Sequence, residues 1–262
     1  MYALNPALGA LWRELLLGVA QHADVSLRWV DHGAPAPLAE LWQREDLGCA
    51  FICGYPWATW SHDMPRPLPL AAPLPRGEPR PQYASDIVVR TDSPFTCIDD
   101  LFGSRIAWTV EDSQSGYQAL RTWLAPQAQA QGGALFGTLV GPLVTPRKVV
   151  EAVLSGQADG GPLDTYAHAL WRRHEPALVA GLRVVARTPP TAMPLFAAAA
   201  SMPEPERERL RAGLLGCSER ADLAPLLDAL CLDGFGPVDP REYARLGERA
   251  RVADRLGYPA LR

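Results

Sequence analysis

Lysine is nearly absent from this chain of 262 residues, because Lys148 is the only one and arginine supplies the other fixed positive charges. The formal net charge is −4 at pH 7. This balance lacks the excess of positive charge that attracts nucleic acid or an anionic membrane surface. The sequence also has no apolar run approaching the ~20 residues that span a membrane. We therefore expect no nucleic-acid partner and no membrane insertion.

Cysteine is sparse as well, with five residues and no CxxC pair. An odd number of cysteines, none of them spaced from a histidine as zinc ligands are, predicts structural thiols and no metal site. The chain contains no G-x-S-x-G, H-x-E, H-E-x-x-H, G-x-G-x-x-G or Walker A sequence. These absences remove the usual signals of hydrolases, zinc enzymes and nucleotide-dependent enzymes. We predict a protein that is not an enzyme and that needs no cofactor.

The first residues lack the hydrophobic segment of a signal peptide. Residues 7–20 have an amphipathic pattern that includes Trp12, Arg13 and Glu14. A signal peptide needs a continuous apolar core instead. The sequence therefore predicts a helix here, and no export signal.

Beyond these absences, the chain shows an alternation of strand-like and helix-like segments. Apolar and β-branched runs predict strands at residues 25–31, 47–53, 86–90, 134–140 and 158–161. Helical spacing predicts helices at residues 7–20, 38–44, 204–215, 223–231 and 240–256, and after Thr145 and Asp164. The alternation predicts an α/β fold with mixed, mostly parallel sheets. The proline-rich residues 65–81 predict an extended connection or an edge segment, because proline cannot donate in a central strand.

Oxygen-bearing side chains stand at three successive strand-to-helix junctions: Ser113 with Ser115, Thr145, and Asp164. Each is a good helix N-cap. Each could also help to hold a bound anion, because helix N-termini present free N–H groups. Junctions of this kind gather at one edge of an open α/β sheet, where ligands bind. Both interpretations stay open at this point. On the helix after Asp164, His168 and His174 stand near two arginines and predict a solvated face.

Two stretches carry a resemblance to a known family. The stretch QYASDIVVRTDSPFTCIDDLFGSRIAWTVEDSQSGYQAL contains, in order, a Tyr-x-Ser strand, a DSP…DL.G.RIAW segment and a Ser-x-Ser-Gly helix start. It is followed by GPLVTPRKVVEAVLSGQADGGPLDTYAH. Over about residues 40–200 this order resembles the phosphate/phosphonate-type periplasmic binding proteins of ABC transporters.

The resemblance implies a two-lobed type II binding-protein fold with the ligand cleft between the lobes. Lobe one would comprise residues 1–87 and 186–262, and lobe two residues 88–185. Crossing strands would lie near residues 83–90 and 184–194. The sequence departs from the family at Val144, where a serine or histidine is usual. It also lacks the strand that the family has ahead of the first helix.

The resemblance also assigns roles to individual residues. An anion would be held at the helix start by Ser113, Gln114 and Ser115, with the backbone N–H groups of Gly116 and Tyr117. Asp164 would accept from a cationic or hydroxyl group of the ligand. Further ligand contacts are implied for Tyr55, Tyr83 and Thr145.

The implied function is capture of a small anionic ligand, phosphonate or phosphate in kind, for ABC-type uptake with a permease as partner. The family resemblance implies a periplasmic location, whereas the predicted lack of an export signal favours the cytoplasm. Two alternatives stay open: an intracellular ligand sensor, and a type II-fold enzyme of thiamine-pyrimidine-like metabolism.

Overall fold

The computed structural model describes residues 1–61 and 63–262. Contacts between residues divide the chain into two compact units. The first unit comprises Met1–Gln82 and Ala192–Pro240, and the second comprises Tyr83–Thr191 and Arg241–Arg262. The chain therefore passes from one unit to the other three times.

The first two passages coincide with short strands. Strands β3 (Gln82–Tyr83) and β9 (Thr191–Ala192) pair with each other there. The third passage lies at the start of helix α10 (Pro240–Arg255). The C-terminal segment thus groups with the second unit, which differs from the lobe boundaries expected from the sequence.

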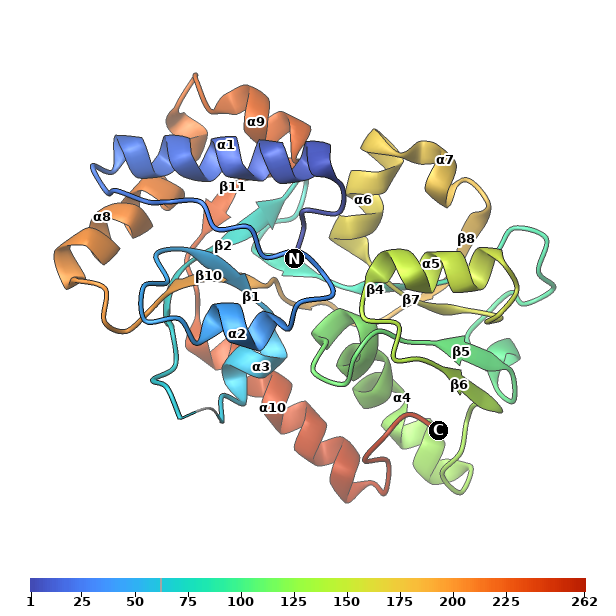
Figure 1. Ribbon diagram of the computed structural model, residues 1–262. Coiled ribbons are helices and arrows are strands. Elements are labelled where there is room, and N and C mark those ends of the chain that lie inside the picture. The colour runs from blue at the N-terminus through green and yellow to red at the C-terminus, as the bar shows by residue number, and fades with distance from the viewer. Residues whose placement is uncertain (62) are drawn as a thin grey trace. The chain divides into compact units, whose positions relative to one another are not determined.

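The first unit is built on a four-stranded sheet in the order β1-β10-β2-β11, in which every neighbouring pair is antiparallel. Its strands are β1 (Ala50–Ile52), β2 (Leu68–Pro75), β10 (Leu195–Ala198) and β11 (Leu232–Gly236). Its helices are α1 (Pro6–His22), α2 (Leu38–Trp42), α3 (Gly54–Ala58), α8 (Glu204–Leu215) and α9 (Ala224–Ala229), with a 3-10 turn at Cys217–Glu219. Figure 1 shows α1 running along this sheet.

The proline-rich segment is wrongly predicted as a connection or an edge, because β2 lies between β10 and β11. Its two neighbours pair with different halves of the strand: β10 with residues 68–71, and β11 with residues 72–75. The N–H of Arg76 donates to the carbonyl of Cys231, next to β11. Successive residues of a strand point their backbone N–H groups to opposite edges. The nitrogens of Pro73 and Pro75 therefore point away from the edge to which Arg76 donates, toward a stretch of the strand that β10 does not reach. Pro73 and Pro75 are therefore tolerated, because this half of β2 has a strand partner on one edge only and needs no ladder bond at their nitrogens.

Helix α1 confirms the amphipathic pattern of the first residues. Asn5 caps it by accepting from the N–H of Leu8 at 2.7 Å, and its inner face buries Leu8, Trp12, Leu15 and Val19. The Trp12 ring contacts Phe51 and Phe196 edge-on, which ties the helix to β1 and β10. The strand predicted at residues 25–31 is not formed, although the Leu27 side chain packs against Gly48.

The second unit has two sheets. Its strands are β4 (Ser85–Arg90), β5 (Arg105–Ala107), β6 (Thr138–Val140), β7 (Gly161–Asp164) and β8 (Leu182–Arg187). Its helices are α4 (Ala119–Ala130), α5 (Pro146–Leu154), α6 (Thr165–His174), α7 (Pro176–Val179) and α10, with a 3-10 turn at Asp99–Leu101 and a π-helical turn at Gln114–Gln118. In the part of the chain that the structure describes, no helix combines the length and the apolar character of a membrane span.

Parallel pairing occurs in part of the second unit. Strands β5 and β6 are parallel, and Ile106 forms a parallel bridge with Gly160 just ahead of β7. Strand β4 pairs antiparallel with both β7 and β8. The prediction of mostly parallel sheets is therefore wrong in this detail, although the α/β class and the mixed pairing are confirmed. Parallel neighbours need a crossover connection, usually a helix, and α4 lies between β5 and β6.

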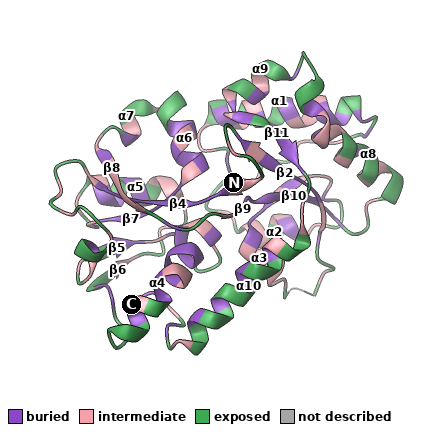
Figure 2. Ribbon diagram, turned by 180° about the vertical axis from the view of Figure 1, so that it is seen from behind, coloured by how far each residue is buried: buried purple, intermediate pink, exposed green. Residues whose placement is uncertain are grey.

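The C-terminal segment completes the core of the second unit. Ala253, Tyr258 and Leu261 are buried in the same cluster as Ile87, Leu120 and other core residues. The buried guanidinium of Arg121 on α4 donates to the carboxylate of Asp254 at 2.8 Å and to the carbonyl of Tyr258 at 2.9 Å. Figure 2 shows β2, β4 and β10 as largely buried, while α8 and α10 carry many exposed residues.

Candidate ligand site in the second unit

Three helix starts meet at one edge of the second unit. Strands β5 and β6 are parallel. The bridge between Ile106 and Gly160 is parallel as well, so the chain that enters β7 runs in the same direction as β5. The carboxyl ends of the three strands therefore point the same way. The loops that follow them lead into the π-helical turn with α4, into α5 and into α6. This is the edge at which ligands bind in open α/β sheets.

Ser113 stands at the first helix start and is an N-cap. Its Oγ accepts from the N–H of Gly116 at 3.0 Å. Its carbonyl accepts from the N–H of Gln118 at 2.9 Å, the wide i to i+5 bond of a π turn. Because Ser113 Oγ accepts from the protein, its own proton is available for a neighbouring acceptor. Capping and ligand binding are therefore compatible at this residue.

Ser115 differs from Ser113. The side chain is half-buried, and its Oγ makes no hydrogen bond within residues 1–61 and 63–262. The carbonyl of Ser115 accepts from Ser85 Oγ at 2.7 Å. The backbone of this turn is thus fixed to β4 while the Ser115 hydroxyl stays uncommitted. An uncommitted hydroxyl at a helix start is suited to an oxyanion.

Thr145 caps α5 by accepting from the N–H of Lys148 at 3.3 Å. The loop ahead of it is tied to the end of β5, because the N–H groups of Leu143 and Val144 donate to the carbonyls of Trp108 and Thr109. Val144 has a φ of 67° and is 44% exposed. A β-branched residue in this left-handed region is strained. The loop therefore holds Thr145 beside the first helix start.

Asp164 caps α6 and is 5% exposed. Its Oδ1 accepts from the N–H groups of Tyr166 and Ala167, each at 2.9 Å. Across the strands, Asp164 pairs with Ser85, the residue that holds the carbonyl of Ser115. The structure therefore brings Ser113, Ser115 and Asp164 together around the first residue of β4.

The other predicted site residues fall into two groups. Gln114, Gly116, Tyr117 and Tyr83 are buried in the second unit. The Tyr117 hydroxyl accepts from the N–H of Leu261, so its ring belongs to the core, and only its backbone faces the helix start. Tyr55 lies on α3 of the first unit, and its predicted role remains a prediction.

Thr109 is a residue of the helix start that the sequence motifs did not indicate. It follows β5, is 3% exposed, and its Oγ1 has no hydrogen-bond partner within the described residues. A Cβ at Gly116 would overlap this Oγ1, so the Thr109 hydroxyl lies directly against the helix start. The signal in the sequence is a threonine at the carboxyl end of a strand that precedes a Ser-x-Ser-Gly turn. Buried hydroxyls are usually paired.

A buried ionic cluster lies behind the site. The Asp86 carboxylate accepts from Arg187 Nε at 2.7 Å and lies 2.8 Å from His168 Nδ1. Burial by itself would raise the pKa of Asp86, but the hydrogen bonds to His168 and Arg187 outweigh it and the pKa is lowered. His168 is 3% exposed, so the predicted solvated face is wrong at this residue. This contact could not be predicted from a local pattern, because Asp86 and His168 are 82 positions apart in the sequence.

Comparison with known proteins gives this geometry a context. The family described as "ABC transporter, phosphonate, periplasmic substrate-binding protein" matches residues 8–243. Among curated proteins, no sequence matches.

Solved structures are similar over most of the chain. A binding protein component of an ABC phosphonate transporter from Pseudomonas aeruginosa has a TM-score of 0.81 at 15% identity, covering 98% of this chain and 85% of its own. PhnD1 from Prochlorococcus marinus, in complex with methylphosphonate, has a TM-score of 0.75 at 17% identity, covering 94% and 91%. The protein XAC2383 from Xanthomonas citri, bound to ATP, has a TM-score of 0.64 at 21% identity, covering 94% and 92%. At these identities the similarity shows the fold, which is the two-lobed α/β fold of type II periplasmic binding proteins.

Proposed function

The chain belongs to the family of periplasmic substrate-binding proteins of ABC phosphonate transporters, and from this premise we propose that it captures a small phosphonate- or phosphate-like anion for uptake. A solute-binding role follows from the family, which is one of transport components and not of enzymes. The proposal extends this role to a ligand class, to named residues, to an ABC permease as partner and to the periplasm as the place of capture.

The hydroxyl of Ser115 is the single observation that carries the proposal. It stands at a helix start, is half-buried, and makes no hydrogen bond within the described residues. Beside it, the Ser113 proton is a further donor. Hydrogen bonds to a charged oxygen contribute about 1.5–3 kcal/mol each. Two hydroxyl donors at a helix N-terminus thus suit an oxyanion.

Charges near the site restrict the ligand further. The nearby cation Arg147 is paired with Glu175 at 2.7 Å, and Arg187 is paired with Asp86. In this proposal neutral donors at the helix start bind the anion, as a helix terminus can, and the exposed Lys148 in the first turn of α5 is the remaining nearby cation among the described residues. In this proposal Asp164 lies on the side where a ligand amine or hydroxyl would be accepted, and Tyr83 and Thr145 line the same edge.

The test is a binding screen by calorimetry with methylphosphonate, phosphate, methanesulfonate and a thiamine pyrimidine precursor. We expect a phosphonate or phosphate to bind and to be recovered unchanged. Ser115→Ala should weaken that binding by about tenfold or more, since one charge-assisted bond is lost.

The matched control is Ser155→Ala, which removes an exposed serine hydroxyl at the end of α5 in the same unit. It should leave affinity unchanged. Equal affinity of the Ser115→Ala variant and the unaltered chain would mean that the Ser115 hydroxyl does not bind the ligand. Turnover of any compound, or no binding of the anions, would contradict the proposed function.

A further inference from the structure

Gln118 is a buried polar residue at the end of the turn that follows Ser113. It is 6% exposed and is the last residue of the π-helical turn at Gln114–Gln118. A side-chain amide has one acceptor atom and one donor group, and its burial without hydrogen bonds costs free energy. The partners of Gln118 therefore show which parts of the second unit this residue connects.

Both donor groups of Gln118 bond to the segment that enters the turn. Its backbone N–H donates to the carbonyl of Ser113 at 2.9 Å, and its side-chain Nε2 donates to the carbonyl of Glu111 at 2.8 Å. Ser113 carries one of the hydroxyls of the candidate ligand site, and Glu111 lies on the exposed loop just before it. One residue thus fixes the backbone at Ser113 and ahead of it.

The turn that Gln118 closes has an uncommon hydrogen-bond pattern. The bond from Gln118 to Ser113 and the bond from the N–H of Ala119 to the carbonyl of Gln114 both join residue i to residue i+5. An α-helix joins i to i+4 instead, and π turns of this kind are frequent at functional sites. Ordinary α-helical pairing is the alternative for this backbone. Contacts that favour the wide turn therefore determine where Ser113 lies.

The acceptor of Gln118 is held from the other side by Arg121. Arg121 Nε donates to Gln118 Oε1 at 3.0 Å, and the same buried guanidinium donates to Asp254 and to the carbonyl of Tyr258. These partners fix the orientation of the Gln118 amide. Turned round, the amide would bring its NH2 group against Arg121 and its oxygen against the carbonyl of Glu111.

We propose that Gln118 is a positioning residue of the candidate ligand site: it holds Ser113 where the anion binds, and through Arg121 it links the site to the C-terminal segment. The inference rests on the proposed function, because it adds a residue to the support of that site. Gln118 is buried and bonded to the protein at both ends of its amide, so it acts through Ser113 and not by contact with the ligand.

Affinity for methylphosphonate and phosphate, measured by calorimetry on fully folded protein, is the first test. Gln118→Met keeps most of the side-chain volume and removes both side-chain hydrogen bonds. We expect it to weaken anion binding about fivefold, because Ser113 is no longer held in place. Gln127→Met is the matched control and should leave affinity unchanged. Gln127 is half-buried on α4, and its Oε1 makes no hydrogen bond within the described residues.

A double-mutant cycle separates positioning from a general loss of structure. If Gln118 acts through Ser113, the two residues are coupled, and the effects of coupled residues do not add. In the Ser113→Ala background, Gln118→Met should therefore weaken binding by less than about twofold. A fivefold loss in both backgrounds would overturn the inference, whatever the change in stability.

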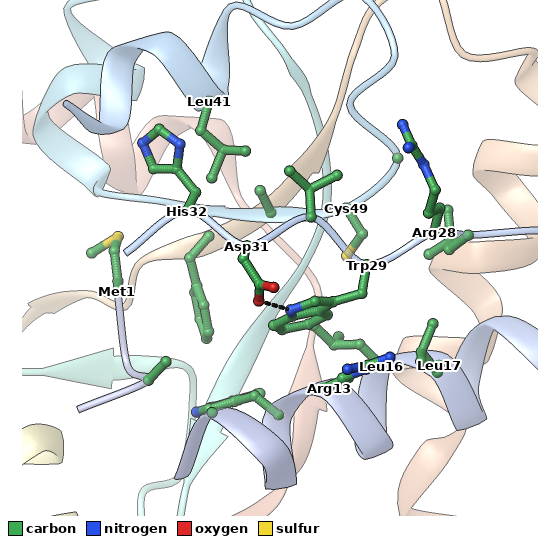
Figure 3. A pocket seen from close by; sticks show the side chains of 18 of the residues that line it. Met1, Arg13, Leu16, Leu17, Arg28, Trp29, Asp31, His32, Leu41 and Cys49 are labelled. Carbon is green, nitrogen blue, oxygen red and sulfur yellow. Dashed lines mark hydrogen bonds between the residues drawn. The ribbon is translucent and has the colours of Figure 1, made fainter. Parts of the chain in front are cut away.

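Amide hydrogen exchange in the ligand-free protein gives a second measurement. Residues 111–118 should exchange faster in the Gln118→Met variant, whereas residues 26–33 of the first unit should be unchanged and serve as the reference. Figure 3 shows this reference segment lining a groove, with the Trp29 indole donating to Asp31 at 2.8 Å. Unchanged exchange at residues 111–118 would overturn the inference.

Gln118→Glu is the second variant, for the case that Gln118→Met does not fold. It keeps an acceptor for Arg121 but lacks the donor for the carbonyl of Glu111. Exchange at residues 111–118 should again be faster, and unchanged exchange would again overturn the inference. If no anion binds to the unaltered chain, the proposed function fails, and exchange alone then decides whether Gln118 holds the turn.

Discussion

Single side chains decide how the first helix start of the second unit is built. Gly116 shows this most directly, because its Cα lies against Thr109 Oγ1 and near Ser113 Oγ. The Ser-x-Ser-Gly turn needs glycine here for lack of space, and not for an unusual backbone angle. Ser85 contributes from β4 by holding the carbonyl of Ser115. Neither contact is visible in the motif itself.

We expect Gly116→Ala to destabilise the protein by about 1–3 kcal/mol, the usual cost of overpacking. The added Cβ would overlap the Thr109 hydroxyl, so adding Thr109→Ala should restore part of the loss. Urea unfolding measures both effects. Gly33→Ala is the control, since a Cβ at Gly33 meets nothing within 4 Å. A Gly116→Ala variant as stable as the unaltered chain would show that the helix start can shift to make room for the added Cβ, and would contradict the overpacking argument.

At the scale of elements, Asp86 joins three segments of the second unit. It lies on β4 and contacts Arg187 at the end of β8 and His168 on α6. The Asp86 side chain is 2% exposed, whereas the Arg187 side chain is 60% exposed. Removing one partner of a buried ionic cluster leaves the others without compensation. This cluster therefore fixes the helix that Asp164 caps.

Asp86→Asn should lower the free energy of unfolding at pH 7 by roughly 3 kcal/mol. The pKa of Asp86 is lowered in the folded protein. Its contribution is therefore fully present above the pKa of the unfolded carboxyl, about 3.9, and is lost as pH falls through the folded pKa. Denaturant unfolding from pH 7 down to pH 3 should show the two proteins converging in stability below about pH 4.

Asp92→Asn is the matched control for this change, because Asp92 forms an exposed pair with Arg90 at the end of the same strand. An exposed pair contributes about 0–1 kcal/mol. A constant difference between the Asp86→Asn variant and the unaltered chain at every pH would contradict the linkage.

At the scale of the whole molecule, the chain passes between its two units three times, and its last segment returns to the second unit. Arg121 fastens that segment. Its buried guanidinium donates to Asp254, to the carbonyl of Tyr258 and to Gln118. The carbonyl of the last residue, Arg262, accepts from the N–H groups of Leu135 and Phe136. The second unit is therefore assembled from segments far apart in sequence.

We expect Arg121→Met to keep most of the buried volume but to leave the carbonyl of Tyr258 without its donor. The cost should be about 3 kcal/mol, from one orphaned buried group and the lost charged hydrogen bonds. Limited proteolysis should then cut residues 241–262 faster than in the unaltered chain. Arg251→Met is the control, since Arg251 pairs with Glu248 on the exposed side of α10. Equal protection of the segment in both variants would mean that apolar packing alone holds it.

Local signals in the sequence determined most of the elements and all three capped helix starts of the site. Thr145 with Pro146, Asp164, and the run at residues 204–215 were placed correctly because capping chemistry and helical spacing act over a few residues. The α/β class followed from the alternation of such elements, and the family followed from the order of its motifs.

Only the tertiary structure decided which edges and which distant residues meet. The central position of β2, the missing strand at residues 25–31, and the buried contact of Asp86 with His168 depend on partners far along the chain. A strand needs a neighbour to form, and a charged side chain can be buried only if its partners arrive with it. The residues of a segment do not determine which distant residues will contact it. Composition therefore predicted these three features wrongly.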